Sequence, residues 1–282
     1  RAGDSPEDFA ADVKWMAEQP QNFFMVKQGI GFHSSMKDSY EDFHYGPKGK
    51  KAGYHGAMDQ GQISEHGFNY MLDCVIAMKE ALGDRVSLAL DCGPGWFLND
   101  AIKFARAVED LDIMWLEDML TGDYVPWVNP QAYRELTNST STPIHTGEQI
   151  YLRHNFKELI ETQAVRVVGP DPADIGGIAE LKWVAEHAYM HNIMMAPHGT
   201  ANGLLGLGAL INVSATLPAN YIAFEYPSAS DPFWNDIVTG LPDGPIVVDS
   251  HVDLLPGPGL GLDIDAKAAK PYLREEDAGF FD

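Results

Sequence analysis

Short apolar runs alternate along the chain with longer segments in which apolar residues recur every three to four positions. Short runs of this kind are typical of buried strands, and the longer periodic segments are typical of helices that cover a sheet. The expected strands are residues 23–27, 86–91, 112–117, 143–147, 165–169, 192–197 and 221–225. The expected helices are residues 5–18, 66–82, 99–109, 130–137, 154–162, 177–190 and 202–216.

This regular alternation predicts an α/β protein built on a parallel sheet. Ser5 before Pro6 is typical of a helix start, and Gly83 is typical of a helix end. The sheet could close into a barrel or stay open as a doubly wound sheet. No glycine-rich phosphate loop follows the early strands, which favours a barrel of the TIM type.

Two segments break the alternation. Residues 28–64 are rich in Gly, His, Tyr and Lys without a regular period, and a loop of that length is usually functional or disordered. Residues 226–282 also lack alternating strands and helices. We therefore predict a catalytic barrel domain over residues 1–225, which includes the 28–64 loop, and a C-terminal extension over residues 226–282 that packs on the barrel.

Composition narrows the class of protein. The chain has 282 residues, 45% of them hydrophobic, and a formal net charge of −22, so it can bury a large core. We expect no nucleic-acid and no membrane partner for so acidic a chain, although the charge can also reflect only a solvated surface. Cys74 and Cys92 form no redox or metal motif, and no apolar run or signal peptide indicates membrane insertion or secretion. A reduced, cytoplasmic protein is the expectation.

Acidic residues follow three successive predicted strands. Asp91, Glu117 and Glu148 are separated by about one strand plus one helix each. A parallel barrel places the carboxyl ends of its strands on one rim, so the three carboxylates should lie close together. Each one alone is more simply an N-cap of the next helix. Three at the same end of successive strands indicate a site for a hard cation such as Mg²⁺.

The next strands supply a possible base. Asp171 follows the strand 165–169, and His198 follows the strand 192–197. Neighbouring strands lie about 5 Å apart, so the two side chains could meet on the rim. A carboxylate that orients an imidazole is a common general base, whereas a lone histidine is usually structural. Glu225 ends the last predicted strand and could donate a proton or bind a substrate oxygen.

Five short motifs occur in a set order over roughly residues 20–230. They are Val86-Ser87-Leu88-Ala89-Leu90-Asp91, Trp115-Leu116-Glu117-Asp118, Thr146-Gly147-Glu148, Pro170-Asp171 with Gly176-Gly177, and Ala196-Pro197-His198-Gly199. Together they resemble the enolase superfamily, in its mandelate racemase subgroup. The resemblance implies a modified (β/α)7β barrel behind an N-terminal capping domain. By this resemblance, we expect that domain and the first barrel strand to be missing from this chain.

The resemblance also implies roles for the rim residues. Asp91, Glu117 and Glu148 would bind one Mg²⁺ per subunit. Asp171 and His198 would form the base pair, as in family members that use a His base with Mg²⁺. A proton α to a carboxylate is weakly acidic, and a divalent cation offsets the charge formed when it is removed.

One lysine departs from the usual pattern. Many family members carry Lys-x-Lys at the end of the second barrel strand, but this chain has only Lys27, followed by Gln28 and Gly29. In one register Lys27 contacts the substrate carboxylate and Gly29 replaces the second base. In the other register Lys27 is the base itself. We favour the first, which disfavours a racemase because racemisation normally needs a base on each face.

The loop 28–64 contributes further candidates. His33, His44 and His55 follow the second barrel strand of the family pattern, where they could contact substrate or supply a second acid. Each is more simply a surface or packing histidine. The spacing of Asp91, Cys92 and Trp96 resembles the L-rhamnonate dehydratase branch, which also favours an acid-sugar substrate.

The resulting hypothesis is a Mg²⁺-dependent dehydratase. It would convert a sugar acid, an aldonate or an aldarate, into a 2-keto-3-deoxy acid. The alternatives are a racemase, epimerase or cycloisomerase that uses the same first step, a hydrolase with a metal-bound water, and a binding protein without catalysis. We expect a homo-oligomer, with the capping domain on the same polypeptide or on a companion chain.

Overall fold

The computed structural model of the chain describes residues 4–45, 61–120, 128–199, 203–226 and 236–282. Within these residues, six parallel strands form one sheet in which neighbours along the chain are neighbours in space. The strands are β1 (Met25–Gly29), β2 (Ser87–Asp91), β3 (Leu116–Glu117), β4 (Ile144–Thr146), β5 (Val167–Val168) and β6 (Met194–Met195). Sequential order is that of a barrel wall, whereas a doubly wound sheet reverses its order. The predicted TIM-type fold is confirmed.

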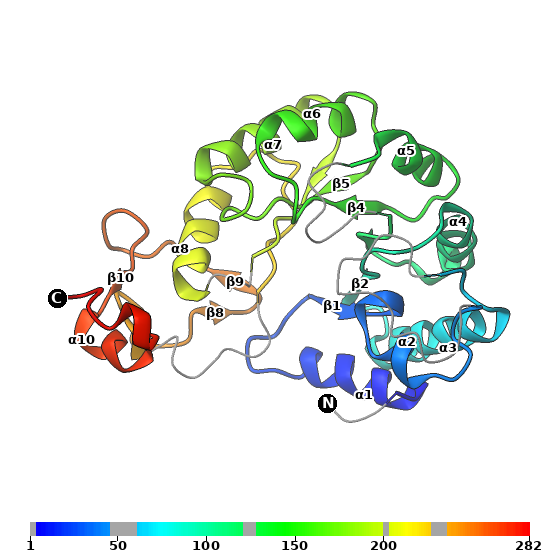
Figure 1. The fold of residues 1–282 in the computed structure, drawn as a ribbon, viewed down its shortest axis with the longest axis horizontal. Coiled ribbons are helices and arrows are strands. Elements are labelled where there is room, and N and C mark those ends of the chain that lie inside the picture. Colours follow the sequence, from blue (N-terminus) through cyan, green and yellow to red (C-terminus); the bar gives the residue numbers. More distant parts are fainter. Residues whose placement is uncertain (1–3, 46–60, 121–127, 200–202, 227–235) are drawn as a thin grey trace.

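Helices cover the outer side of the strands. They are α1 (Pro6–Ala17), α2 (Met36–Ser39), α3 (Glu65–Leu82), α4 (Leu98–Ala107), α5 (Pro130–Asn138), α6 (Arg153–Glu161), α7 (Ile178–Met190) and α8 (Gly203–Ser214). Helices α4 to α8 form an arc around the strands in Figure 1. The predicted ends of two helices are confirmed, since Ser5 forms a capping box with Asp8 and Gly83 follows α3 with a φ of 65°.

Strand register aligns the residues that matter for the site. Gly29 pairs with Asp91, Asp91 with Glu117, and Glu117 with His145. These four residues therefore lie at one level across β1 to β4. Because paired residues of a parallel sheet project to the same side, the two acidic side chains point in a common direction.

The predicted strand 221–225 is only partly formed. Tyr221 makes a single parallel bridge to Met195, and the Ile222 N–H donates to the Met195 carbonyl at 2.8 Å. The next ladder bond would need an N–H at Pro197, which proline lacks. The pairing slips there, and the Glu225 N–H donates to the Pro197 carbonyl at 3.0 Å. The segment thus stays beside β6 without forming a regular strand.

The 28–64 segment contains more regular structure than its sequence predicts. A 3-10 helix (Gly31–His33) and α2 follow β1 directly. Phe32, Met36 and Phe43 are almost fully buried, so apolar anchoring replaces a periodic pattern. Residues 46–60 of the predicted loop lie outside the described residues.

Residues after 236 form small elements. They are β7 (Val238–Thr239), β8 (Val247–Val248), β9 (His251–Val252), β10 (Asp263–Ile264) and α10 (Ala266–Ala269), with 3-10 turns at Lys270–Tyr272 and Glu275–Asp277. Apolar residues of this region pack against Leu204, Leu207 and Ile211 of α8. The domain boundary after residue 225 stays a prediction.

The β8–β9 hairpin lies beside the entry to β1. The Ser250 N–H donates to the Gln21 carbonyl at 2.8 Å, and the Phe24 N–H donates to the Ser250 hydroxyl at 3.2 Å. The hairpin therefore joins the C-terminal region to the first strand of the sheet, as its position in Figure 1 also shows.

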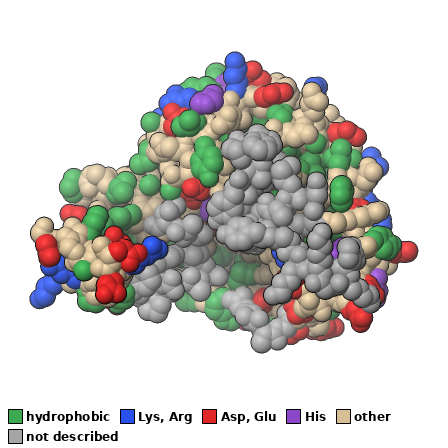
Figure 2. All heavy atoms as spheres, viewed as in Figure 1, with side chains coloured by type: hydrophobic (Ala, Val, Ile, Leu, Met, Phe, Trp, Pro, Cys, Tyr) green, Lys and Arg blue, Asp and Glu red, His purple; other side chains and the backbone are tan. Residues whose placement is uncertain are grey.

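Acidic side chains are spread over the face seen in Figure 2, in keeping with the net charge of −22. Among the described helices, none combines the length and the hydropathy that crossing a bilayer requires.

Candidate active site

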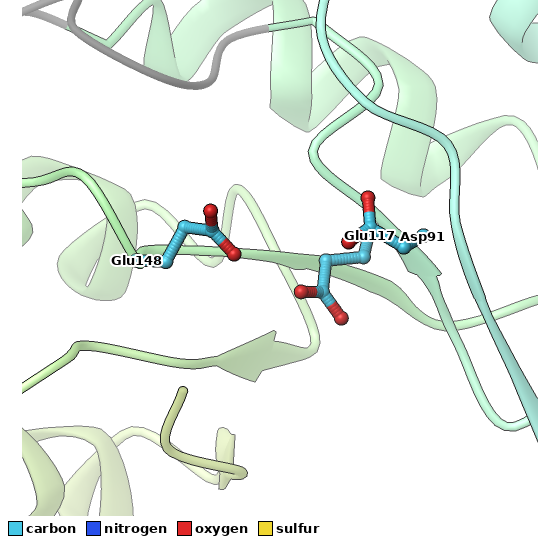
Figure 3. A group of neighbouring side chains, drawn as sticks. All are labelled: Asp91, Glu117 and Glu148. Carbon is cyan, nitrogen blue, oxygen red and sulfur yellow. The ribbon is translucent and has the colours of Figure 1, made fainter. Parts of the chain in front are cut away.

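Three buried carboxylates converge at the carboxyl ends of the strands. Asp91 ends β2, Glu117 ends β3, and Glu148 follows β4. Each offers an oxygen within 4.8 Å of the others, and all three are less than 9% exposed. In Figure 3 the Glu148 carboxyl is turned toward Glu117 and Asp91. The structure thus brings together the three residues that the sequence predicts as metal ligands.

The electrostatics of this cluster are those of a site that needs a cation. Burial raises the pKa of Asp91, although the ammonium of Lys27 opposes the effect. Burial and the charges of Asp118 and Asp91 raise the pKa of Glu148 well above its ordinary value. A donor set made only of carboxylate oxygens suits a hard divalent cation such as Mg²⁺, so these residues fit the expected group.

Lys27 lies among the carboxylates. Its Nζ is 2.6 Å from Oε1 of Glu117, 3.2 Å from Oε2 of Glu225 and 3.6 Å from Oδ2 of Asp91. Burial favours the neutral amine, but these carboxylates outweigh it and raise the pKa of Lys27 well above its ordinary value. Burial likewise favours the neutral acid at Glu117, but Lys27, together with His145 and the Trp115 N–H, outweighs it and holds the pKa of Glu117 well below its ordinary value.

His198 and Asp171 form the predicted pair. Nδ1 of His198 lies 2.8 Å from Oδ2 of Asp171, which is only 1% exposed. The other Asp171 oxygen accepts a hydrogen bond from the Ala173 N–H at 2.7 Å, so the carboxylate has a fixed orientation. Burial favours the neutral imidazole, but the hydrogen bond to Asp171 and the charges of Glu225 and Asp171 together outweigh it and raise the pKa of His198.

The second nitrogen of His198 faces the acidic cluster. Nε2 is 3.6 Å from Oε2 of Glu148 and 3.4 Å from Oε2 of Glu225. Since Asp171 accepts from Nδ1, the neutral ring carries its proton there and leaves Nε2 free to accept one. The arrangement can therefore remove a proton from a molecule bound between His198 and the three carboxylates.

The loop histidines differ from one another in position. Nδ1 of His33 is 3.3 Å from Oδ1 of Asp91, which places this side chain at the site. His44 instead forms a backbone bridge with Ile63 in the loop. His55 lies outside the described residues.

Two residues beside Glu117 are missing from the sequence-based prediction. The Trp115 indole N–H donates to Oε2 of Glu117 at 2.8 Å, and Nδ1 of His145 is 3.6 Å from the same oxygen. Burial lowers the pKa of His145, although Glu117 opposes the effect. The available signal was strand periodicity, because Trp115 lies two residues before Glu117 on the same face of the strand.

These features define a class of protein: a parallel barrel that carries its polar site at the carboxyl ends of the strands. Residues 48–268 match the family described as Enolase C-terminal domain-like. The chain belongs to this family, and the predicted resemblance to the enolase superfamily is confirmed.

Individual relatives agree with this assignment. A D-xylonate dehydratase from Haloferax volcanii is 33% identical over 212 residues, which cover 75% of this chain and 49% of the relative. A D-galactarolactone cycloisomerase from Agrobacterium fabrum is 25% identical over 207 residues, which cover 71% of this chain and 53% of the relative. The chain spans about half the length of the curated relatives it matches.

A solved structure shows the same fold. The mandelate racemase/muconate lactonizing enzyme-like protein from Rubrobacter xylanophilus superposes with a TM-score of 0.78 and 32% sequence identity. The match covers 96% of this chain and 62% of that protein.

Proposed function

We propose that the protein dehydrates a sugar acid, an aldonate or an aldarate, to a 2-keto-3-deoxy acid. The observation that carries this proposal is the His198–Asp171 pair, whose free nitrogen faces the buried cluster of Asp91, Glu117 and Glu148. A similarity to a D-xylonate dehydratase supports it. A Mg²⁺ ion held by the three carboxylates would supply the positive charge that stabilises the enediolate.

The protein side chains would move the protons. His198 Nε2 takes the proton from the carbon next to the substrate carboxylate, and the electron pair of that C–H bond enters the enediolate. The hydroxyl on the adjacent carbon then leaves with the proton that His198 has gained, as water. The resulting enol tautomerises to the 2-keto-3-deoxy acid, so one water molecule is lost and no oxidant is needed.

Lys27 has two possible roles in this reaction. Its ammonium contacts Glu117, Asp91 and Glu225, and a positive charge beside the proposed metal ligands supports the role of a contact to the substrate carboxylate. Solvent deuterium exchange distinguishes the roles. If Lys27→Met raises KM but His198 still exchanges the α-proton, Lys27 is a contact, and if exchange on one face disappears, Lys27 is a base.

Cycloisomerisation of a carboxylic acid is the second candidate. A relative named D-galactarolactone cycloisomerase supports it. Both reactions begin with removal of the α-proton, so the same His198 would serve. They differ in the leaving group, which is water in dehydration and a ring oxygen that stays attached in cycloisomerisation.

We also propose that a further strand closes the barrel, on the same polypeptide or on a companion chain. Among the described residues, β1 pairs with β2 alone. Residues 23–27 and residues 221–226 both line a cavity of about 680 Å³. Amide exchange at Met25 and Lys27 tests this, because their N–H groups face away from β2 and should be protected only when that strand is present.

The deciding experiment is a substrate screen. The protein, together with any closing segment, is incubated with Mg²⁺ and a library of mono- and diacid sugars, and 2-keto acids are detected as semicarbazones. Formation of a 2-keto-3-deoxy acid supports the dehydratase. Absence of product and of α-carbon deuterium incorporation across the library would overturn it, and a product with the same mass as its substrate, formed without loss of water, would favour the cycloisomerase. If the protein is first separated by size, the activity of each fraction shows which oligomer is active.

A further inference from the structure

We propose that Trp115, His145 and Gly169 act together as a positioning unit for Glu117, holding its carboxylate ready for the cation. The inference rests on the metal site of the proposed function, and it concerns residues beside the ligands. The three residues come from the position before β3, from β4 and from the position after β5, respectively.

Trp115 holds one oxygen of Glu117. Its indole N–H donates to Oε2 at 2.8 Å, and an indole N–H can only donate. The other oxygen, Oε1, lies 2.6 Å from Nζ of Lys27, which also contacts Asp91. Oε1 is therefore the oxygen on the side of the acidic cluster, and the Trp115 hydrogen bond fixes which oxygen faces it.

His145 supports the indole. Its ring stacks on Trp115 with a centroid distance of 5.3 Å and an interplanar angle of 21°. Its Nε2 lies 3.2 Å from the Ala196 carbonyl, and because a carbonyl only accepts, Nε2 carries the proton in this bond. His145 is 2% exposed, so the ring is held between Trp115 and the backbone after β6.

Gly169 makes room for this arrangement. A Cβ atom at residue 169 would lie 2.2 Å from Nε2 and 2.4 Å from Cε1 of His145, closer than real contacts allow. The imidazole therefore passes directly over a position without a side chain. Only in this way can it reach from β4 across β5 to the Ala196 carbonyl.

One nitrogen of the His145 ring forms no hydrogen bond among the described residues. This nitrogen, Nδ1, is buried and lies 3.6 Å from Oε2 of Glu117. A ring that served only to fill the interior would be exchangeable for an apolar one, since a buried polar atom without a partner is unfavourable. With its proton on Nε2, the ring has no N–H at Nδ1 to donate, so His145 acts on Glu117 through the Trp115 indole on which it stacks.

A purely structural role predicts a different result from a positioning role. Loss of packing lowers the temperature of unfolding and leaves the affinity of the folded site for its cation unchanged. Loss of positioning weakens cation binding, by about 10–100-fold for residues that support metal ligands. Cation affinity, measured without substrate, therefore separates the two.

The first test replaces the donor. We expect Trp115→Phe, which keeps an aromatic ring but loses the N–H, to weaken Mn²⁺ binding about 10–100-fold, measured by electron paramagnetic resonance. Trp96→Phe is the matched control, because Trp96 is 3% exposed and donates its N–H to the Cys92 carbonyl. Equal affinities in wild type and Trp115→Phe, or equal losses in both variants, would overturn the proposal. If wild type binds no Mn²⁺, the metal site of the proposed function fails instead.

The second test uses the close approach at residue 169. Gly169→Ala should displace His145 and weaken Mn²⁺ binding, whereas in a His145→Ala background the same change should have a much smaller effect, because only the approach of the Cβ to the Ala196 carbonyl oxygen at 2.7 Å then remains. Such non-additivity is expected only of residues that act through one contact. A Gly169→Ala effect of the same size in both backgrounds, or no effect in either, would show that the ring does not transmit it. The double variant relieves the conflict with the ring, although the Cβ still lies 2.7 Å from the Ala196 carbonyl oxygen. If no variant with alanine at residue 169 folds, His145→Ala alone tests the unit, and unchanged Mn²⁺ affinity in it would overturn the proposal.

Discussion

A single neighbouring oxygen determines which ring nitrogen of His198 can accept a proton. Asp171 accepts from Nδ1 at 2.8 Å and is itself fixed by the Ala173 N–H. Nε2 is consequently the atom that faces Glu148 and Glu225. Orientation of the ring and location of its proton thus follow from one carboxylate that is almost completely buried.

His198→Asn should abolish turnover, with a loss of at least about 100-fold, because asparagine keeps the approximate shape but cannot accept the proton. Mg²⁺ affinity should remain within a few-fold of wild type, since His198 is outside the ligand set. Steady-state kinetics and calorimetric titration with Mg²⁺ measure the two effects. His154→Asn, an exposed histidine on α6, is the control and should keep full activity. Full activity in His198→Asn would remove this residue from the mechanism.

At this scale the sequence identifies which side chains meet, but not how they contact each other. Asp91, Glu117, Glu148, Asp171 and His198 were placed at strand ends by their spacing, and the structure brings them together. Their catalytic roles stay predictions. The ion pairs of the lysine at the end of β1 depend on side-chain conformations, which no spacing rule specifies.

Helices of the barrel wall are stabilised mainly by one buried face. Helix α3 buries Met71, Val75 and Met78 at helical spacing, and all three are fully buried. Packing of this kind follows directly from the hydrophobic period that identified the helix in the sequence.

Met78→Ala should therefore lower the free energy of unfolding by about 2–5 kcal/mol, because it removes buried contacts and leaves a cavity. Urea denaturation followed by circular dichroism measures the change. Glu80→Ala, at an exposed position of the same helix, is the control and should change stability by no more than about 0.5 kcal/mol. A loss at Met78 no larger than at Glu80 would contradict the assigned packing.

Helix α7 carries a histidine that should make stability depend on pH. Burial, and then the charge of His191, lower the pKa of His187, while Glu161 at 3.5 Å opposes them. The unfolded chain then binds more protons than the folded chain as the pH falls through the ordinary histidine pKa of about 6.5. Stability from this group is present above that pH and is lost as the pH decreases toward the folded value.

His187→Gln should accordingly flatten the decline in stability between about pH 7 and pH 5. Urea midpoints measured across this range test the expectation. His154→Gln, on the exposed surface of α6, is the control substitution. An unaltered slope in His187→Gln would show that His187 titrates normally in the folded protein.

Elements differ in how far the sequence predicts them. Strand–helix alternation predicted every strand of the six-stranded sheet. It predicted the segment 221–225 as a strand too, although Pro197 on the neighbouring segment interrupts the ladder. That failure has a cross-strand cause, because the proline that prevents pairing lies on a different segment from the residues it affects.

The metal site joins three segments that are far apart in the sequence. Its three ligands come from β2, from β3 and from the residues after β4, so a bound cation would join these segments against the mutual repulsion of their carboxylates. Because binding to the folded state alone stabilises it, a cation at 100 times its Kd should add about 2.7 kcal/mol to the free energy of unfolding.

Mg²⁺ should therefore raise the unfolding temperature of the metal-free protein in a concentration-dependent way. Differential scanning fluorimetry after EDTA treatment measures the shift. In the variant that combines Asp91→Asn, Glu117→Gln and Glu148→Gln, the shift should disappear. A shift that persists in this variant would locate the stabilising cation elsewhere.

By itself, the sequence determined the class of fold, the level of the site and the chemical nature of its donors, because these depend on periodicity and on residue type along the chain. Only the tertiary structure decided that Lys27 lies among the carboxylates and that Trp115 and His145 support Glu117. These contacts join strands through register and close packing. The absence of a side chain at Gly169 is enough to let the His145 ring of β4 pass β5. The reason for a glycine at this position therefore becomes clear only when the neighbouring strands are seen together.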